Sequence, residues 1–304
     1  MNDKFKDITG SDNWKNIVLI DKGWSSDKKY YINTNNGEQF LLRLSNISEY
    51  HTKKDDYELL KQLDELPVIM SRPLAFDVCN DGNDVYTLFT WVDGKDAERI
   101  IPMLSDIEQY KIGVQAGEIL RKIHETKVRH NLPEWSHRFN NKINRKIAAY
   151  EACSIKFEGS DSIINYINEN RFLLENRPQV FQHGDYHIGN MTISEKGDLG
   201  IIDFNRLDFG DPWEEFNRIT FCAGVSKFFA SGRINGYFDN NVPDTFFRLL
   251  ALYIGCNQLS SIPWAIPFGQ DDINYMLKQA MNVLEWYKGF KTYIPSWYIF
   301  NNEI

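Results

Sequence analysis

The strongest constraint on the fold of this chain is a change of hydrophobic period near residue 92. Before that point the sequence contains short β-rich segments at 16–20 (NIVLI), 28–34 (KKYYINT), 38–45 (EQFLLRLS) and 85–92 (VYTLFTWV). Asn35-Asn36-Gly37 separates two of these segments and is a strong hairpin signal. These patterns predict an antiparallel sheet.

A single helix is predicted within this first part, over residues 53–66. Asp56, Leu60 and Leu63 fall on one helical face, whereas Glu58 points away from it. Several antiparallel strands with one helix form a small α+β lobe. We therefore expect an N-terminal lobe over residues 1–92.

After Asp93-Gly94 the pattern becomes mainly helical. Residues 107–126 have the spacing of an amphipathic helix, and 138–175 favour two more. A short β insertion follows at 179–182, 191–194 and 199–204, and the chain is again largely helical from 214 onward. We expect a larger lobe over 93–304, with a hinge at 90–94.

Composition excludes several classes of protein. The chain has 304 residues, of which 42% are apolar and 25% charged, which is typical of a globular protein. Its net charge of −8, with no basic half or tail, argues against nucleic acid as a partner and leaves a cationic ligand open.

Membrane and redox roles are also not expected. The apolar stretch at 249–256 is shorter than the roughly 20 residues of a membrane span, and the first ten residues contain no apolar leader. The four cysteines are scattered, with no CxxC pair. We expect a cytoplasmic monomer.

The segment HGDYHIGN at 183–190, followed by IIDF at 201–204, carries the chemistry. Asp185 and Asn190 lie five residues apart in a turn, and Asp203 ends an apolar strand. Carboxylate and amide oxygens are hard ligands that suit Mg²⁺ and leave room for phosphate oxygens. A carboxylate beside such a metal can accept a proton from a substrate hydroxyl.

This pattern resembles the catalytic loop and metal-binding motif of protein kinases. The HGD form is similar to that of aminoglycoside and macrolide phosphotransferases, and choline- and fructosamine-type kinases share much of it. The segment FGDPWEEFNR at 209–218 resembles the family's Gly-Asp-Pro segment. The resemblance implies a bilobal, α+β, protein-kinase-like fold with a β-rich N-terminal lobe and a larger helical C-terminal lobe.

The resemblance also implies roles for individual residues. Asp185 would be the catalytic base or hydroxyl-orienting group, and Asn190 and Asp203 would hold Mg²⁺ against the nucleotide phosphates. The alternative for Asp185 is a loop acid in an Asx-turn. His183 is expected to support the loop by hydrogen bonding, and His187 to pack within it.

Nucleotide contacts are expected from the first lobe. The turn DKGWSSDKKYYI has no GxGxxG pattern, so hydroxyls such as those of Ser25 and Ser26 would contact the phosphates, unless the turn is an ordinary hairpin. Arg43 stands where kinases carry a lysine, and keeps its positive charge. We expect Asp56 as its partner, with Glu58 as the alternative.

The segment LFTWVDG at 88–94 matches the kinase hinge. There the carbonyl of Thr90 and the amide of Val92 are expected to contact the adenine. ATP is the expected nucleotide, with GTP as the alternative in this family.

The acceptor is the least constrained part of the prediction. Asp208, Asp211, Glu214 and Glu215 form either an acidic rim for a cationic aminoglycoside or structural contacts, with Asp211 bracing the catalytic loop and the two glutamates at a helix N-terminus. Aromatic residues of the second lobe either line a macrolide pocket or form core. We expect a kinase for a hydroxyl of an aminoglycoside-type antibiotic.

Four alternatives remain beside this function. They are a macrolide kinase, a metabolite kinase, a protein kinase and a nucleotide-binding pseudokinase scaffold. A protein kinase is disfavoured because HGD replaces HRD, DFN replaces DFG and no APE-like segment follows. The scaffold is disfavoured because Asp185, Asn190 and Asp203 are all present.

Overall fold

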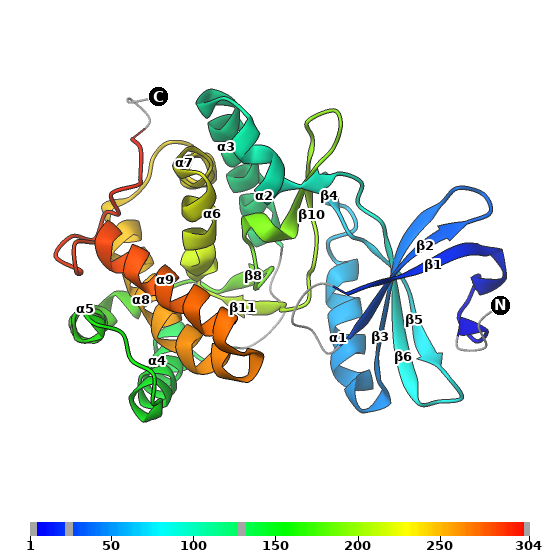
Figure 1. Cartoon of the computed structure of the whole chain (residues 1–304), viewed down its shortest axis with the longest axis horizontal. Coiled ribbons are helices and arrows are strands. Elements are labelled where there is room, and N and C mark those ends of the chain that lie inside the picture. The colour runs from blue at the N-terminus through cyan, green and yellow to red at the C-terminus, as the bar shows by residue number, and fades with distance from the viewer. Residues whose placement is uncertain (1–4, 22–26, 127–131, 301–304) are drawn as a thin grey trace. The chain divides into compact units, whose positions relative to one another are not determined.

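Figure 1 shows the computed structural model of the chain, which describes residues 5–21, 27–126 and 132–300. The chain divides into two compact units. Unit 1 comprises residues 1–95 and 192–205, and unit 2 comprises residues 96–191 and 206–304. Residues 192–205 thus belong to unit 1, although the sequence placed them in the second lobe, because their strand pairs with a segment of the first ninety residues.

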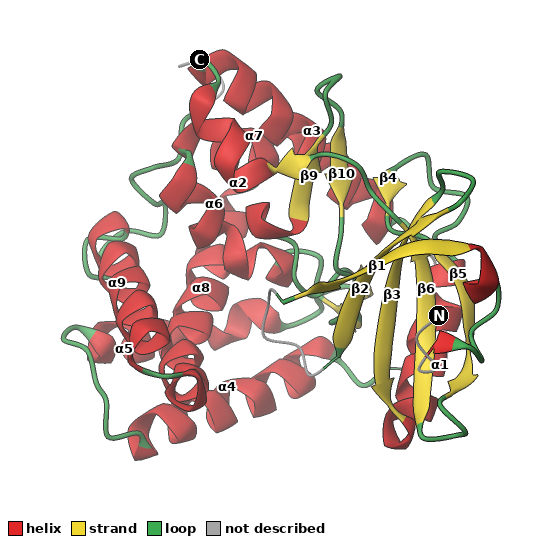
Figure 2. Cartoon of the chain, turned by 45° about the vertical axis from the view of Figure 1, so that its right-hand side comes forward, coloured by secondary structure: helices red, strands yellow, loops and turns green. Residues whose placement is uncertain are grey.

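Unit 1 contains a five-stranded antiparallel sheet (Figure 2), with strand order β1-β2-β3-β6-β5. Its strands are β1 (Trp14–Ile20), β2 (Lys28–Thr34), β3 (Gln39–Asn46), β5 (Pro73–Cys79) and β6 (Asp84–Thr90). The predicted hairpin joins β2 to β3, with Gly37 at a φ of 82°. The strand β5 was not predicted because Pro73 interrupts the pattern. Proline fits here as the first residue of an edge strand.

Helix α1 (Tyr50–Lys61) begins three residues before and ends five residues before the predicted 53–66. Leu63 and Leu60 are buried as expected. The chain leaves the helix after Lys61 and continues in turns whose carbonyl groups are bound by Arg72. The guanidinium of Arg72 donates to the backbone oxygens of four residues, at 2.6–2.9 Å, which satisfies them outside a helix: Leu63, Asp64, Leu66 and Val68.

The hairpin of residues 192–205 extends a second, four-stranded sheet with order β4-β10-β9-β7. These strands are β4 (Ile69–Met70), β7 (Lys95–Asp96), β9 (Met191–Ile193) and β10 (Leu199–Ile201). Gly200 of β10 pairs in parallel with Ile69 of β4. Gly94, at a φ of 141°, approaches this hairpin so closely that a Cβ would lie 2.8 Å from the oxygen of Ile193.

Unit 2 is mainly helical. A two-stranded antiparallel ribbon of β8 (Val180–Gln182) and β11 (Asp208–Gly210) flanks the HGD motif. The helices are α2 (Ala97–Ile100), α3 (Asp106–His124), α4 (Trp135–Ala152), α5 (Ser160–Asn170), α6 (Ile219–Val225), α7 (Lys227–Tyr237), α8 (Asp244–Ala265) and α9 (Gln270–Trp286).

Two features of these helices follow directly from the sequence. Ser105 and Glu108 form a capping box that starts α3, because each side chain accepts from the other's backbone amide. The helical segment from Asp244 to Phe268 is long and apolar enough to cross a membrane by length and composition alone. However, 67% of its most apolar window is buried inside the protein, so it serves as a core helix of unit 2.

Helices α3 and α7 pack with their backbones in direct contact. Gly113 and Gly117 of α3 face the carbonyl groups of Phe229 and Arg233 on α7. Reciprocally, Gly232 and Gly236 of α7 face the backbone of α3 at Tyr110 and Val114. A Cβ at any of these four glycines would overlap a backbone atom, which no rotamer change relieves.

We predict that Gly117→Ala lowers the free energy of unfolding by at least about 2 kcal/mol, because α3 and α7 must separate. Gly224 provides the matched control, since it lies in α6 and a Cβ there would meet only Gln279 Nε2 at 3.9 Å. Gly224→Ala should leave stability unchanged or raise it by up to about 1 kcal/mol. Urea denaturation of both variants measures the difference, and equal effects would contradict the packing described.

Candidate active site

The HGD motif occupies the loop between β8 and the short 3-10 helix η6 (Ile188–Asn190) of unit 2. Gly184 has a φ of 79°, and a Cβ there would overlap the backbone carbonyl of Arg206. Glycine is therefore required between His183 and Asp185 for two separate reasons. The backbone N–H of Asp185 donates to His183 Nδ1 at 3.2 Å, so the buried histidine supports the loop, as the sequence suggested.

Glu215 is the acid that braces this loop. The buried carboxylate accepts the Gly184 amide at 3.0 and 3.2 Å and the Tyr186 amide at 3.4 Å. Burial opposes ionisation, but the imidazoles of His124, whose Nε2 lies 3.9 Å away, and His183, together with the Gly184 amide bond, hold the pKa of Glu215 below its usual range. One of the two interpretations of the sequence gives this bracing role to Asp211 and places Glu215 at a helix N-terminus; Glu215 does lie in the first turn of a 3-10 helix, but it also braces the loop.

A fully buried arginine lies behind the loop. The guanidinium carbon of Arg233 lies 4.7 Å from the ring centres of both Tyr186 and Phe216, and Nη2 donates to the carbonyl of Glu215 at 3.3 Å. The hydroxyl of Tyr186 donates to the carbonyl of Ala116 at 2.7 Å. The residue after Asp185 is thus held by α3 and α7, which limits the movement of the Asp185 backbone.

The carboxylate of Asp185 lies among cationic and imidazole groups. Arg218 Nη1 is 2.6 Å from Oδ1, His187 Nε2 is 3.4 Å from Oδ1, and Arg206 Nε is 3.8 Å from Oδ2. Burial raises the pKa of Asp185, but the nearby imidazole of His187 and the two arginine charges outweigh it and hold the pKa far below the usual range. Asp185 is therefore ionised at every pH at which a protein of this kind works.

His187 takes a larger part than the packing role predicted for it. Its Nδ1 accepts the Gly189 amide at 3.1 Å, which leaves the proton on Nε2, facing Asp185. Asn190 completes the loop, since its Nδ2 donates to the Asp185 carbonyl at 2.9 Å. A carbonyl is only an acceptor, so the contact fixes the amide orientation. The Asn190 Oδ1 accepts no hydrogen bond from the described residues and points away from that contact.

The predicted site residues of unit 1 include Asp203, which follows β10. Asp203 has a φ of 65°, a strained conformation for a non-glycine residue. The Asn205 amide donates to the Asp203 carbonyl at 2.8 Å and closes a tight turn there. Arg43 Nη1 binds Asp203 Oδ1 at 2.7 Å. The structure therefore brings Arg43 and Asp203 together within one unit.

Asp27 is the acid that holds Arg43, and sequence reasoning missed it. Its Oδ2 accepts from Arg43 Nε at 3.2 Å and from Lys53 Nζ at 2.9 Å, and its Oδ1 accepts from Ser45 at 2.8 Å. The Asp27 side chain is 2% exposed, and its position before β2 carries no periodic signal. The only sequence clue was an acid at the start of a strand that pairs with β3.

The predicted partnership of Arg43 with Asp56 is wrong for this structure. Asp56 faces inward and Glu58 is exposed, as the helical spacing required. Within the described ranges, however, Asp56 makes no ion pair, because the shorter side chain leaves Arg43 to Asp27 and Asp203. Burial raises the pKa of Asp56, with Lys53 opposing it. Asp56 lines one cavity of unit 1 together with Arg43, Lys53, Phe204 and Asn205.

The remaining predicted contacts lie at the end of β6 or outside the described part. Thr90 ends β6, and its hydroxyl accepts the Arg72 amide at 2.9 Å. Val92 follows, is 7% exposed, and its N–H makes no hydrogen bond within the described ranges. A free amide there suits a ligand acceptor. Ser25 and Ser26 lie outside the described residues.

The oxygen donors fit a hard divalent cation. Asn190 offers a free amide oxygen in unit 2, and Asp203 offers a carboxylate in unit 1, both ligand types that Mg²⁺ prefers. In the part of the chain that the structure describes, no three His, Cys, Asp or Glu residues cluster as a metal site. Softer metals that require imidazole or thiolate ligands therefore find no such cluster there.

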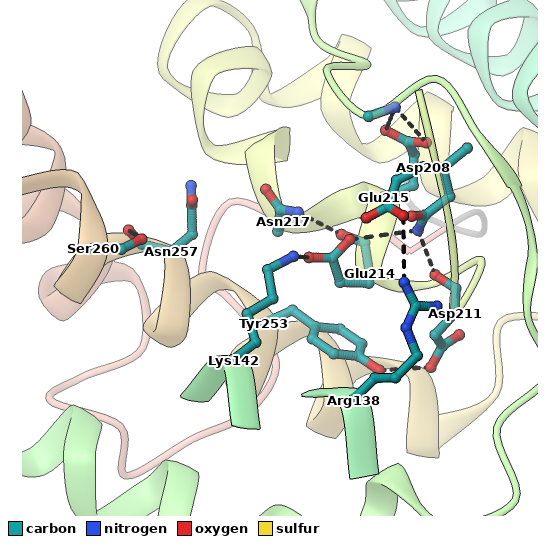
Figure 3. A network of polar contacts seen from close by, with 12 residues as sticks. Arg138, Lys142, Asp208, Asp211, Glu214, Glu215, Asn217, Tyr253, Asn257 and Ser260 are labelled. Carbon is teal, nitrogen blue, oxygen red and sulfur yellow. Dashed lines mark hydrogen bonds and ion pairs between the residues drawn. The ribbon is translucent and has the colours of Figure 1, made fainter. Parts of the chain in front are cut away.

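The acidic residues at 208–215 do not form an exposed rim. Figure 3 shows their contacts. Asp211 is fully buried against Arg177 at 2.6 and 2.8 Å and Tyr253 at 2.6 Å. Glu214 binds Lys142 at 3.0 Å, and Asp208, 52% exposed, lies 3.4 Å from Arg138. Of the two interpretations of this segment, structural contacts therefore describe it better than an acidic rim for a cationic ligand.

Three of the aromatic residues proposed for a macrolide pocket belong to the core. Tyr253, Tyr287 and Trp297 are 1%, 0% and 5% exposed. Tyr253 also donates to Asp211 and accepts from Trp135 Nε1 at 2.9 Å, so its hydroxyl is used inside unit 2. These three residues are therefore not available to line an open pocket.

Comparisons with known proteins place this geometry in context. A family model described as a phosphotransferase enzyme family matches residues 16–247. A comparison with curated protein sequences finds no match. The likeness to solved structures, at low identity, concerns the fold, and it confirms the predicted protein-kinase-like α+β architecture.

Three solved structures illustrate that likeness. The GDP complex of wild-type aminoglycoside 2'-phosphotransferase-IIIa has a TM-score of 0.67 at 18% identity, covering 92% of this chain and 94% of that one. The GDP and kanamycin complex of APH(2")-IIIa has a TM-score of 0.67 at 17% identity, with 93% and 96% covered. A thermostable mutant of aminoglycoside phosphotransferase APH(4)-Ia, in complex with AMP-PNP and hygromycin B, has 0.68 at 14% identity, with 92% and 96% covered.

We predict that Asp27→Asn lowers the free energy of unfolding at pH 7 by about 3 kcal/mol, since it leaves Arg43 and Lys53 without a buried anion. Arg43 and Lys53 outweigh burial and lower the pKa of Asp27. Its contribution is therefore complete above the unfolded pKa of about 4 and is lost as the pH falls through the lowered folded pKa.

Urea denaturation between pH 3 and pH 8 tests this expectation. The difference in the free energy of unfolding between wild type and Asp27→Asn should decrease below about pH 4, the usual aspartate pKa. Asp55→Asn is the matched control, because Asp55 is exposed on α1. A gap that stays constant down to the lowest pH would show that Asp27 stabilises unit 1 without its charge.

Proposed function

This chain belongs to the phosphotransferase enzyme family, and we propose that it is a small-molecule kinase that transfers the γ-phosphoryl group of ATP to a hydroxyl group. The membership confirms the prediction of a phosphotransferase with an alcohol acceptor. The observation that carries the proposal is the loop of Asp185. Its carboxylate is held ionised, its backbone is braced by Glu215, and Asn190 binds its carbonyl.

Asp185 is the proposed hydroxyl-orienting group. Phosphoryl transfer passes through a loose transition state, so the protein contributes chiefly positioning and electrostatic stabilisation. An ionised carboxylate accepts a hydrogen bond from the acceptor hydroxyl and aims its oxygen at phosphorus. Because the pKa of Asp185 is so low, it takes the proton only late, when the attacking oxygen has become acidic.

Unit 1 supplies the proposed nucleotide contacts. The guanidinium of Arg43 contacts the carboxylates of Asp27 and Asp203, and Lys53 contacts the same oxygen of Asp27. Arg43 and Lys53 both line the cavity that Phe204 and Asn205 also line. Both suit phosphate oxygens. Thr90 and the free Val92 amide are the proposed adenine contacts, and Ser26 and Asp56 complete the proposed nucleotide set. The same main-chain contacts serve GTP as the alternative.

Mg²⁺ is the proposed metal, with Asn190 and Asp203 as its protein ligands. When bound, Mg²⁺ neutralises phosphate charge and orients the phosphoryl group. The strained backbone of Asp203 and the fixed amide of Asn190 hold each oxygen in place before any ligand binds. Arg43 occupies Asp203 Oδ1 at 2.7 Å, so metal binding competes with that ion pair.

We expect Asp185→Asn to lower kcat for phosphoryl transfer by about 10²–10⁴-fold, because the amide cannot accept the hydroxyl proton. Nucleotide affinity should remain within threefold of wild type, since Arg43 and Asp27 of unit 1 are untouched. Product formation from γ-labelled ATP measures kcat, and calorimetry measures nucleotide binding.

Asp208→Asn is the matched control for this experiment. Asp208 lies in the same unit, but its side chain is 52% exposed, lies 3.4 Å from Arg138 and accepts the Phe209 amide, while its backbone pairs with Gln182 of β8. Its substitution should leave kcat unchanged. Full turnover by Asp185→Asn would remove Asp185 from the reaction and defeat the proposal.

A further inference from the structure

Two arginines lie beside the carboxylate of Asp185. Arg218 and Arg206 both approach its carboxylate, at 2.6 and 3.8 Å. Arg218 uses Nη1 for this contact, while its buried Nε has no hydrogen-bond partner within the described part of the chain. One donor of the Arg218 guanidinium is therefore left unsatisfied by the described residues.

Helix α4 adds two lysines to this region. Lys142 and Lys146 lie one turn apart on α4, and Lys142 binds Glu214 at 3.0 Å. Lys146 makes no ion pair or hydrogen bond to any residue that the structure describes. Burial lowers the pKa of Lys146, and the positive charges of Lys142 and Arg218 act in the same direction. The carboxylate of Glu214 acts in the opposite direction but is already paired with Lys142, so the half-buried ammonium of Lys146 has no direct anionic partner unless a ligand supplies one.

The charges of this region can be compared directly. Four cationic side chains, Arg206, Arg218, Lys142 and Lys146, lie among the carboxylates of Asp185, Glu214, Glu215 and Asp208. Asp185 contacts Arg218, Glu214 contacts Lys142, Asp208 contacts Arg138, and Glu215 accepts the loop amides. Each of these carboxylates therefore already has a partner, whereas Lys146 has no ion-pair partner among the described residues.

We propose that the acceptor is an anionic hydroxyl compound, a hydroxy acid or sugar phosphate, whose carboxylate or phosphate is bound by Lys146 and Arg218. This inference rests on the proposed function, and it replaces the aminoglycoside-type acceptor that the sequence favoured. A cationic acceptor offers Lys146 no partner, whereas an anion supplies the one that it lacks. Carboxylate and phosphate share this chemistry, and the experiment separates them.

The test uses the full chain with ATP and Mg²⁺ and four acceptors built on one sugar ring. These are glucuronate, glucose 1-phosphate, glucose and glucosamine, with kanamycin as a polycation. We expect kcat/KM for the better anionic compound to exceed that for glucosamine at least about tenfold, the value of one charge-assisted contact. The better of glucuronate and glucose 1-phosphate identifies the anion. Faster turnover of glucose, glucosamine or kanamycin would overturn the inference and leave the kinase proposal intact.

Variants of Lys146 assign the effect to the proposed contact. Lys146→Gln should raise KM for the anionic acceptor about tenfold, and Lys146→Arg should restore it to within threefold. Arg145→Gln removes one positive charge from the exposed side of the same helix and should not change KM. Equal increases in KM for Lys146→Gln and Arg145→Gln would show that Lys146 acts only through its long-range charge, and would overturn the proposed contact.

A binding measurement decides the inference even if no compound is phosphorylated. Millimolar glucuronate or glucose 1-phosphate should raise the Tm of the wild-type protein but not that of Lys146→Glu, while glucosamine should raise neither. Protection by neither anion would overturn the inference. Absence of any phosphorylated product, with protection intact, would instead count against the proposed function.

Discussion

The buried carboxylate of Glu215 is the interaction on which the candidate active site depends. Its oxygens accept the amides of Gly184 and Tyr186, the residues on either side of Asp185. Glu215 lies in the 3-10 helix η7 (Glu214–Arg218), which also carries Glu214, the partner of Lys142, and Arg218, the partner of Asp185. One short helix therefore braces the backbone of the catalytic loop through Glu215, contacts its carboxylate through Arg218 and binds Lys142 through Glu214. The Asp211 contacts with Arg177 and Tyr253 anchor the chain just before it.

Unit 1 is organised by a different buried acid. Asp27 joins Arg43, Ser45 and Lys53, and Arg43 extends from it to Asp203. The planar guanidinium explains why arginine serves here. It contacts Asp27 through Nε and Nη2 and Asp203 through Nη1, whereas a lysine carries a single ammonium nitrogen and lacks this planar set of donors. The strained turn at Asp203 and the arginine fork together fix one oxygen-bearing side chain of the unit.

The sequence predicted what is local or contiguous. The Asn36-Gly37 hairpin and the inward side of α1 follow from short-range rules, and HGDYHIGN places Asp185 and Asn190 in one turn. It could not predict partners that meet only after folding. Asp27 and Arg43 are distant in sequence and share no periodic pattern, and Glu215 reaches the loop from 31 residues away. The acidic rim suggested by residues 208–215 failed for the same reason. Whether these acids are buried and paired depends on residues such as Arg177 and Lys142 that lie elsewhere in the chain.

The central claim is that this chain forms a phosphate ester on the hydroxyl of a small molecule. Phosphorus NMR of a reaction containing the protein, ATP, Mg²⁺ and the acceptor panel follows both products at once. The account predicts a new phosphomonoester resonance that grows in equal amount with ADP. Formation of ADP with inorganic phosphate alone, or nucleotide that binds and remains intact with every acceptor, would contradict it.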